Sequence, residues 1–595
     1  MKKEKLYEVF MGLIPFLLIM INHIFFFICN RPILSDSSFV PFQSIIIVYT
    51  IFLFLIFLTK SYKKANIILI IISFIVTTIN QIKIFYMQEP IYLSDIKLLG
   101  SLGDVFKITD GTYGSLSKYL LLFIIKTLIL TGIFIFAKRY KEKEQKRNYY
   151  FIIPIILLII LSLPIKGINN LVKGTFHSDS FKDYTSVSSN LDYYKVYGFT
   201  GGMYFNILDS RIFKPDNYNK EEIDKVLNYQ SDNNMEADYN IILVFSESFF
   251  DITKLDEIEF NKDILSSYHE LESKGKLISM ITPTYGGRSC NVEFELLTSN
   301  NLSYYDISYI PYLYFNKKDF NRYDNFLTTM KDSNIVSTSY ITTSDNLYNV
   351  GNVYNYLGFT NKIENREEDI NTKFIPDKYV TDRIIEYTNN ENNKFFLFAT
   401  TMQNHMPYKK DKYSNYNVSI KNSKLDDDSN EAILSYAQGL YEAGNELKRL
   451  YEYINTIDKK TIIVFLGDHL PYLSNQKGDN LIDKLDYFNT DDANLNLYRK
   501  YNTEALILSN FDIEFDDTKY LSPDLLVPYL LKTLKVKMNS YYDYLINESK
   551  EILPSYNKYV AMDKEGNIYS ISELPDNMKK EYNLRHSLQY NLYYE

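Results

Sequence analysis

Cysteine is scarce in this chain, because 595 residues contain only Cys29 and Cys290. Domains that are held together by disulfides need paired cysteines, and the half of the chain beyond about residue 165 holds only Cys290. A disulfide framework is therefore excluded in that half. Its stability must come from a hydrophobic core of its own, which a segment of this length can bury.

An excess of positive charge is also missing. The formal net charge is −9, and no basic stripe occurs outside the short loops between apolar segments. Nucleic-acid binding depends on clustered lysine and arginine side chains. We therefore expect no nucleic-acid partner.

Long apolar runs, in contrast, are abundant before residue 166. Five of them approach the roughly 20 residues that cross a bilayer, and polar loops separate them. No small-x-small cleavage site follows the first run, so it is not typical of a cleaved signal peptide. The sequence predicts a transmembrane domain over residues 1–166, with five spans near 8–29, 42–59, 65–82, 118–137 and 150–166.

Basic residues indicate the orientation of these spans, because short cytoplasmic loops are enriched in lysine and arginine. Such residues precede the first span and fill the loops between the second and third spans and between the fourth and fifth, whereas the loop at 30–41 holds only Arg31. We therefore expect a multi-pass protein of the cell membrane. Its N-terminus would lie inside, and everything after the fifth span would be extracellular.

The remainder of the chain alternates apolar runs with amphipathic stretches. The run 241–245 is apolar throughout and bounded by polar residues, which is typical of a strand buried in a parallel or mixed sheet. This alternation indicates an α/β domain over 239–545. A linker with helices is predicted at 167–238 and a polar C-terminal tail at 546–595. Further strands are predicted at 277–281, 335–341, 394–401, 461–466 and 505–509, and helices at 431–454 and 523–534.

Side chains capable of chemistry follow four of these strand-like runs. Open α/β sheets bind their ligands at the carboxyl edge of the strands, so we expect these side chains to meet. In chain order they are Glu247, Ser289, His405 and the pair Asp468–His469.

Two carboxylates, an imidazole and a hydroxyl make an oxygen-rich ligand set that suits Mn²⁺ or Mg²⁺, with Zn²⁺ possible. A divalent ion on the Ser289 oxygen would lower its pKa and make it a nucleophile. Two glycines and a helix start at this serine also suit a phosphate. His405 is then available to bind or protonate a substrate. The predicted metal ligands are Glu247, Ser289, Asp468 and His469.

Each of these residues also has an ordinary structural interpretation. Ser289 could serve only as a helix N-cap, and His405 could be a hydrogen-bonded structural histidine. Glu247 could be a solvent-facing carboxylate at a strand end. The functional interpretation is favoured because all of these residues fall at equivalent strand ends.

Several motifs in one order indicate a family. After its first strand-like run the chain reads S-E-S, then G-G-R-S-C-N-V-E-F-E, Q-N-H-M-P and G-D-H. It resembles the lipoteichoic acid synthase family, phosphoglycerol transferases of the sulfatase/alkaline-phosphatase superfamily. The resemblance covers nearly all of the chain before about residue 545. It implies a five-helix transmembrane domain and an extracellular sulfatase-like α/β/α sandwich with a mixed, mostly parallel sheet.

The resemblance also implies roles for individual residues. Ser289 would be the nucleophile in place of the family's threonine, at a metal site usually loaded with Mn²⁺. His405 and Asp345 match substrate-binding positions. Val350 stands where the family has a substrate-binding arginine, so one ligand for phosphate is missing.

The implied activity is transfer of glycerol phosphate from phosphatidylglycerol, a membrane lipid, to a glycolipid or a growing polyglycerophosphate chain (lipoteichoic acid) through a covalent Ser289 intermediate. The alternatives are transfer of phosphoethanolamine or another phospho-head group, and an inactive sensor or scaffold. The single external cysteine argues against the phosphoethanolamine transferases, whose external domains are disulfide-rich. Sulfatase activity requires Cys or Ser followed by x-Pro-x-Arg, and neither Ser289 nor Cys290 begins such a motif.

Overall fold

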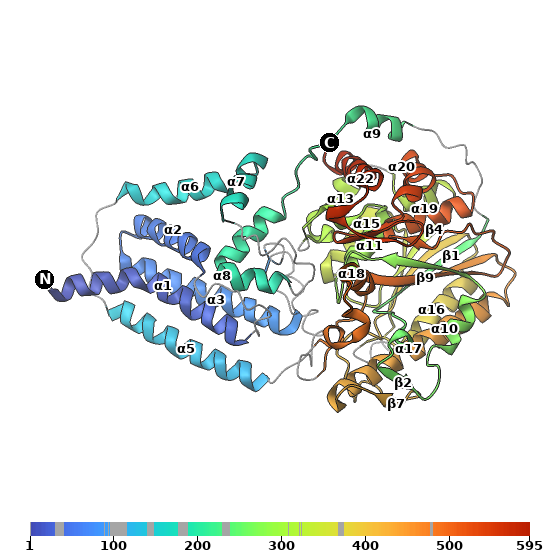
Figure 1. Cartoon of the computed structure of the whole chain (residues 1–595), viewed down its shortest axis with the longest axis horizontal. Coiled ribbons are helices and arrows are strands. Elements are labelled where there is room, and N and C mark those ends of the chain that lie inside the picture. The colour runs from blue at the N-terminus through green and yellow to red at the C-terminus, as the bar shows by residue number, and fades with distance from the viewer. Residues whose placement is uncertain are drawn as a thin grey trace. The chain divides into compact units, whose positions relative to one another are not determined.

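The computed structural model divides into two compact units, which are described one at a time (Figure 1). Unit 1 comprises Met1–Ile96, Thr112–Phe213 and Asp306–Ser308, and unit 2 comprises Lys97–Gly111, Lys214–Tyr305 and Tyr309–Glu595. The predicted loop at 30–41, except its last residue, and the basic residues between 141 and 147 lie outside the described residues. The structure describes residues 2–29, 41–87, 90–92, 95, 116–139, 148–176, 189–228, 238–306, 309–320, 322, 324–366, 374–475 and 480–595.

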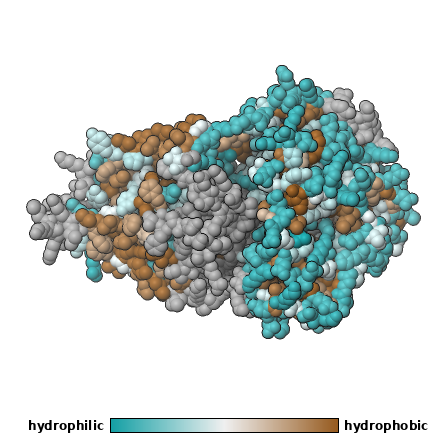
Figure 2. All heavy atoms as spheres, viewed as in Figure 1, coloured by the Kyte–Doolittle hydropathy of each residue, from teal (hydrophilic) through white to brown (hydrophobic). Residues whose placement is uncertain are grey.

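Unit 1 consists of helices, and α1 packs against α2, α3 and α5 around a core that includes Leu18, Phe52 and Leu69. Many isoleucine and leucine side chains also lie on the outside of this bundle, and Figure 2 shows hydrophobic residues gathered there. Helices that are apolar on their outer face are typical of contact with lipid. The bounds are α1 (Lys2–Cys29), α2 (Phe42–Thr59), α3 (Tyr62–Met87), α5 (Leu116–Arg139), α6 (Ile153–Leu161), α7 (Lys166–Phe176) and α8 (Ser189–Asp209).

Three of these helices are long and apolar enough to cross a membrane, in the segments Tyr7–Phe26, Phe42–Thr59 and Tyr62–Ile84. The bent pair Tyr149–Leu161 and Lys166–Lys173 would make a fourth, with 109° between its two parts. The count of three to four among the described residues is roughly consistent with a transmembrane domain. Helix α5 covers the fourth predicted span.

The fifth predicted span, 150–166, is not one straight helix. Its helical part ends at Leu161, and Pro164 lies in the turn before α7. Proline lacks an N–H and does not continue a helix easily. The segment Tyr149–Leu161 is about 20 Å long, shorter than the roughly 30 Å hydrocarbon core of a bilayer.

Unit 2 contains an eight-stranded sheet in the order β10-β3-β9-β8-β1-β6-β4-β5. Only β9 in this sheet runs antiparallel to its neighbours, so the sheet is mixed and mostly parallel, as predicted. The strand bounds are β1 (Asn240–Ser246), β3 (Lys276–Ile281), β4 (Val336–Tyr340), β5 (Asn361–Ile363), β6 (Phe395–Thr400), β8 (Thr461–Gly467), β9 (Asn502–Ser509) and β10 (Tyr520–Leu521). A two-stranded sheet pairs β2 (Ile258–Phe260) with β7 (Ile420–Ser423).

Helices cover both faces of this sheet (Figure 1). Alternate strand residues point to opposite faces, and Ile242 and Ile463 share one core with Leu440 of the long helix α17. On the other face the ring of Phe326 in α14 lies 4.8 Å from that of Phe396 in β6. Because both faces are buried, the central strands are apolar throughout. The helix bounds are α9 (Lys220–Leu227), α10 (Ser266–Glu272), α11 (Ser289–Thr298), α12 (Pro311–Tyr314), α13 (Lys317–Phe320), α14 (Phe326–Asp332), α15 (Val350–Leu357), α16 (Asp377–Asn390), α17 (Asp427–Ile454), α18 (Ala493–Tyr501), α19 (Pro523–Thr533), α20 (Ser540–Tyr544), α21 (Lys550–Ile552) and α22 (Asp576–Tyr594).

Residues 546–595, predicted as a separate polar tail, are folded into unit 2. They form the three-stranded sheet β11 (Ser555–Tyr556), β12 (Val560–Met562) and β13 (Ile568–Ser570), followed by α22. The ring of Tyr593 in α22 lies 6.2 Å from that of Phe294 in α11. Tyrosine combines a large apolar ring with one hydroxyl, so a tyrosine-rich stretch reads as polar and still packs in a core. The predicted linker at 167–238 divides between the units, with α7 and α8 in unit 1 and α9 in unit 2.

Candidate active site

Two neighbouring strands bring the acidic residues together. Strands β1 and β8 are parallel, and their register pairs Ser246 with Gly467. The residues that directly follow these two, Glu247 after β1 and Asp468 after β8, are therefore neighbours. A Cβ atom on Gly467 would lie 2.2 Å from the backbone oxygen of Phe249, so only glycine allows this approach. Ligand atoms of Glu247, Asp468 and His469, all buried, lie within 4.8 Å of one another.

The hydrogen bonds around Asp468 leave one of its oxygens facing the imidazole. Its Oδ1 accepts from the backbone N–H groups of Ser248 and His469, both at 2.7 Å. Its Oδ2 is buried and accepts no hydrogen bond from the part of the chain that the structure describes. That atom lies 3.3 Å from Nε2 of His469.

His469 is oriented by its other ring nitrogen. Nδ1 donates to the carbonyl oxygen of Leu470 at 2.9 Å, which leaves Nε2 facing Oδ2 of Asp468. A buried carboxylate oxygen with no hydrogen bond is unfavourable, and a cation bound between it and the ring nitrogen would satisfy both atoms. In metal-binding histidines, the ring nitrogen that does not bind the metal usually donates its N–H to a carboxylate or a backbone carbonyl, as Nδ1 does here. The donor set therefore fits a divalent cation. Ligands 2.0–2.6 Å from one ion are up to about 4–5 Å apart, which agrees with the observed spacing.

Ser289 begins helix α11 and reaches the same place. Its Oγ lies 3.4 Å from Nε2 of His469, and the side chain is half-buried and so accessible. The loop before it is tied to the histidine's loop, because the N–H of Gly286 donates to Leu470 at 3.0 Å. Arg288 adopts a left-handed backbone with φ of 65°. Strained backbone of this kind concentrates at functional sites.

The electrostatics of the site show a shortage of positive charge. Burial raises the pKa of Glu247 well above its usual value, and the nearby Asp468 carboxylate raises it further. The Ser248 hydroxyl donates to Glu247 at 2.8 Å, and this hydrogen bond and the charge of Lys412 act in the opposite direction. A bound divalent cation would reverse the balance and hold both carboxylates ionised.

The structure places the remaining predicted residues on the same edge of the sheet but not in this cluster. His405 lies in the loop after β6, the other neighbour of β1, and its Nδ1 donates to the carbonyl oxygen of Met406 at 2.7 Å. Asp345 lies in the loop after β4, is exposed, and forms an ion pair with Lys362 at 2.6 Å. Val350, at the family's arginine position, is buried at the start of α15.

The comparison with known families decides the classification. The Sulfatase family matches residues 239–536, half of the chain. The chain belongs to the sulfatase family. This agrees with the resemblance to the sulfatase/alkaline-phosphatase superfamily, and the match lies entirely within the predicted catalytic domain, 239–545.

The individual similar proteins carry names that differ in what they act on. A Rhizobium meliloti (strain 1021) protein named "Putative cyclic beta-1,2-glucan modification protein" is 28% identical over 288 residues, which are 47% of this chain and 44% of that protein, so the chain spans under half of its length. A Streptococcus pyogenes phosphoglycerol transferase, GacH, in complex with sn-glycerol-1-phosphate, is 22% identical with a TM-score of 0.49, covering 64% of this chain and 95% of that one. The Neisseria meningitidis lipooligosaccharide phosphoethanolamine transferase A (EptA) is 12% identical with a TM-score of 0.49, covering 89% of this chain and 96% of that one.

Lys412 is a charged residue at the sulfatase site that sequence reasoning missed. Its Nζ donates to the carbonyl oxygen of His405 at 2.6 Å, and its charge lowers the pKa of Glu247 against the dominant effect of burial. The residue lies in the charged stretch 409–412, which reads as an ordinary solvated loop. Its position seven residues after His405 was the available signal.

Glu293 is a buried acid one turn beyond the serine in α11. Its Oε2 accepts hydrogen bonds from the hydroxyls of Tyr312 at 3.2 Å and Tyr354 at 2.8 Å. Because Tyr354 belongs to α15, this carboxyl links the serine's helix to a second helix. Burial raises the pKa of Glu293 to about 7.

We predict that Glu293 makes stability fall as pH rises. The folded state keeps a proton that the unfolded chain releases at its ordinary pKa of 4.5, so the free energy of unfolding should decrease between about pH 4.5 and 7. Glu293→Gln cannot ionise and keeps an oxygen for both tyrosines. In EDTA at pH 8 it should be more stable than the wild type by about 3 kcal/mol, with the difference shrinking toward pH 4.5.

Unfolding of unit 2 can be followed at one thiol. Cys290 is buried in α11, so in a Cys29→Ser background of the full chain in detergent a thiol-reactive dye reports its exposure. Glu573→Gln, a change at an exposed glutamate, is the matched control and should change neither stability nor its pH dependence. A Glu293→Gln protein with the wild-type pH dependence would contradict the assignment.

We also predict that a divalent cation stabilises unit 2 through Asp468. A ligand that binds only the folded state raises its stability, by about 2.7 kcal/mol at 100 times the dissociation constant. Adding Mn²⁺ to metal-stripped protein should raise the temperature at which Cys290 becomes reactive, and Asp468→Asn should remove most of this rise. Glu565→Gln, at an exposed carboxylate elsewhere in unit 2, should retain it. The absence of any rise with Mn²⁺, Mg²⁺ or Zn²⁺ in the wild type would exclude the proposed metal site.

Proposed function

We propose that the protein is a membrane-anchored, metal-dependent phosphoglycerol transferase that moves glycerol phosphate from phosphatidylglycerol to a glycolipid or a growing polyglycerophosphate chain. The observation that carries this proposal is the 3.4 Å approach of the Ser289 hydroxyl to His469, within the buried cluster that also holds Glu247 and Asp468. A hydroxyl at the start of a helix, beside a candidate cation site, is arranged for attack on a phosphate diester. The ordered motifs support the choice of glycerol phosphate within the superfamily.

The covalent role of Ser289 follows from its position. Its oxygen forms a bond to phosphorus while the bond to the diacylglycerol oxygen breaks; the serine gives up one proton and the leaving alkoxide takes up one. In the second half of the reaction an acceptor hydroxyl attacks the phosphorus and releases the serine. Each half exchanges one oxygen–phosphorus bond for another, so no oxidant or energy source is required.

Glu247, Ser289, Asp468 and His469 would hold the cation, which we propose to be Mn²⁺. When bound, a divalent ion lowers the pKa of the serine hydroxyl and offsets charge on the phosphoryl oxygens. His405 contributes by binding the substrate or giving a proton to the leaving group, since it lies in the loop after the neighbouring strand β6 and an imidazole can do either.

Lys412 offers a replacement for the arginine that Val350 does not supply. Its ammonium group donates to the carbonyl oxygen of His405, and its charge acts on Glu247. We propose that its ammonium group offsets charge on the substrate phosphate. A lysine binds phosphate as a point charge rather than by a two-pronged arginine contact, so the substrate would be held with less directional control.

The helices of unit 1 would hold the reaction at a membrane. Apolar helices long enough to span a bilayer anchor the sulfatase domain to the membrane that contains the lipid donor. Tethering raises the effective concentration of both the donor and an anchored acceptor. With the orientation expected from the basic loops, the reaction would occur outside the cell.

We predict that Ser289→Ala abolishes transfer while the domain stays folded. Purified full-length protein with Mn²⁺ and phosphatidylglycerol should release diacylglycerol and acquire a phosphoglycerol group on the Ser289 peptide, and Ser289→Ala should do neither. Ser289→Thr should retain activity, because threonine also supplies a hydroxyl. Retained turnover in Ser289→Ala would refute the mechanism. If phosphatidylethanolamine labels the Ser289 peptide faster than phosphatidylglycerol does, the transferred group is phosphoethanolamine and not glycerol phosphate.

We predict that Lys412→Met lowers kcat/KM about 10- to 100-fold, because a charged contact with phosphate contributes roughly 1.5–3 kcal/mol. Lys412→Arg should retain most of the activity. Lys410→Met is the matched control, because Lys410 is exposed in the same loop and pairs with Glu431 at 3.5 Å. Equal activity of Lys412→Met and the wild type would exclude a role for this lysine in phosphate binding.

A further inference from the structure

The C-terminal residues 546–595 supply neither the nucleophile nor a metal ligand of the proposed reaction. They nevertheless bond to both ends of the segment that carries Ser289, which consists of β3, the loop 282–288 and α11. Strand β11 and the turn after it contact the first end, and α22 contacts the second. These contacts connect the C-terminal residues to the position of the serine.

The first end is the carboxyl end of β3. The Ser555 hydroxyl of β11 accepts from the N–H of Ile281, the last residue of β3, at 3.1 Å. The side-chain amide of Asn557 donates to the carbonyl oxygen of Thr282, the first residue of the loop, at 3.0 Å. The N–H of Thr282 donates to Tyr501 at 2.9 Å, so the sheet holds the peptide before Thr282 and Asn557 holds the peptide after it. Asn557 is therefore a contact just beyond the sheet, where the chain turns toward the serine.

Asn557 is itself fixed in the turn between β11 and β12. Its side-chain oxygen accepts from the N–H groups of Tyr559 at 2.8 Å and Val560 at 3.1 Å, and its own N–H donates to the carbonyl oxygen of Val560 at 2.9 Å. The side chain is buried, and these bonds direct its amide nitrogen at Thr282. A side chain that its neighbours lock in this way can hold a partner to within about 0.5 Å.

The second end lies directly after α11. The side-chain amide of Asn301 donates to Oδ1 of Asp524 at 3.1 Å. Arg585 of α22 contacts Oδ2 of the same carboxylate at 3.5 Å and donates to the carbonyl oxygen of Leu553 at 2.9 Å. The side chains of Asn301, Asp524 and Arg585 are all buried, where polar contacts are strong. Helix α22 thus holds the far end of the segment through one shared carboxylate.

Between these ends the chain has no regular structure to hold it. Every residue of the loop 282–288 is described, and none lies in a strand or a helix. Gly286 and Gly287 both have positive φ, so the loop includes backbone with few steric limits. The acidic metal ligands follow β1 and β8 instead, in the middle of the sheet. The 3.4 Å distance from Ser289 to His469 therefore depends on how the ends of the segment are held.

We propose that Asn557 is a positioning residue of the transfer reaction. It holds the carbonyl oxygen of Thr282 and so fixes the start of the loop, which keeps the Ser289 hydroxyl at the metal ligands. Ser555 acts in the same way on the N–H before the loop. The inference rests on the proposed role of Ser289 as nucleophile and does not depend on which head group is transferred.

Asn557→Asp tests this role, because it removes the donor to Thr282 and keeps an oxygen for the turn. In full-length protein with Mn²⁺ and phosphatidylglycerol it should lower kcat about 10- to 100-fold, since a displacement of about 1 Å near the reacting atoms can cost 100-fold in rate. KM should stay within about twofold, and Mn²⁺ should still raise the temperature at which Cys290 becomes reactive. Wild-type kcat would overturn the proposal. Loss of the Mn²⁺ effect together with kcat would indicate general loosening of unit 2 and would also overturn it.

Two sets of variants support this measurement. Asn567→Asp is the matched control, because the Asn567 amide donates to Asp563 at 2.9 Å inside the next turn of the same small sheet, and it should leave kcat unchanged. If Asn557→Asp fails to fold, Ser555 decides the question. Ser555→Ala should lower kcat, whereas Ser555→Thr keeps the hydroxyl and should retain most of it. Equal kcat in these two proteins would overturn the proposal.

A thiol probe separates this inference from the choice of substrate. In a Cys29→Ser, Ser289→Cys protein the new thiol lies beside the candidate cation site, and Zn²⁺ should slow its alkylation at least tenfold by binding the thiolate. Cys290 is buried and stays unreactive in the folded protein. Adding Asn557→Asp should reduce the protection to threefold or less, and adding Asn567→Asp should not change it.

The outcomes of the thiol experiment are distinct. Undiminished protection in the Asn557→Asp protein would overturn the positioning role. No protection in the parent protein would place the thiol away from the cation and would overturn it as well. Loss of protection in Asn557→Asp, combined with a wild type that does not turn over phosphatidylglycerol, would support the positioning role and refute the proposed substrate alone.

Discussion

Two buried carboxylates beside an imidazole cannot both remain charged unless a cation compensates them, and this constraint shapes the candidate site of unit 2. Burial of an uncompensated charge costs several kcal/mol, and the raised pKa of Glu247 reflects that cost. The parallel register of β1 and β8 creates the cluster, because it brings two consecutive strand ends to the same level. The apolar interior of the sheet, covered on both faces, holds those strand ends rigidly. Glu247 and Asp468 therefore connect the fold directly to the chemistry.

Much of the fold could be predicted from residue pattern alone. Strands buried on both faces are apolar throughout, so β1, β6 and β8 were visible as uninterrupted runs, and the long helix α17 was visible from its spacing of leucines. The cluster of Glu247, Asp468 and His469 was predictable for a related reason, since polar residues directly after such runs must lie at the edge of the sheet. Position along the chain is informative where a strand ends.

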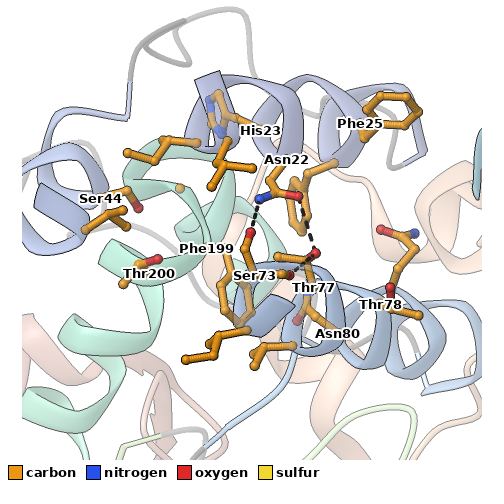
Figure 3. Close-up of a pocket in the computed structure, with 18 of the residues that line it drawn as sticks. Asn22, His23, Phe25, Ser44, Ser73, Thr77, Thr78, Asn80, Phe199 and Thr200 are labelled. Atoms are coloured by element: carbon orange, nitrogen blue, oxygen red, sulfur yellow. Dashed lines mark hydrogen bonds between the residues drawn. The ribbon is translucent and has the colours of Figure 1, made fainter. Parts of the chain in front are cut away.

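Other features depend on contacts that one-dimensional pattern does not contain. Lys412 approaches the site through a loop, and its neighbours in sequence are ordinary surface residues. The C-terminal residues pack through tyrosine rings, although a tyrosine-rich stretch reads as polar in the sequence. The ring of Tyr593 packs near that of Phe294 in α11. In unit 1 a cavity of about 320 Å³ depends on how five helices pack (Figure 3), and the hydropathy of each helix says nothing about the spaces between them.

The antiparallel strand β9 has a consequence for the geometry of the reaction. It separates β3, which leads to the serine, from β8; Ile281 at the end of β3 is level with Asn502 of β9, whereas Leu466 near the end of β8 is level with Ala505. Strand β8 ends one residue later, at Gly467, so β3 extends two residues, or about 7 Å, farther than β8, and the loop after β3 has to turn back. A slip of β9 by two residues would keep every side chain on its proper face and still shift β3 by about 7 Å, twice the gap between the serine and the histidine. Strand β9 contributes no ligand to the site. Its hydrogen-bonding register nevertheless determines the distance between the loop that carries Ser289 and the strand end that carries Asp468 and His469.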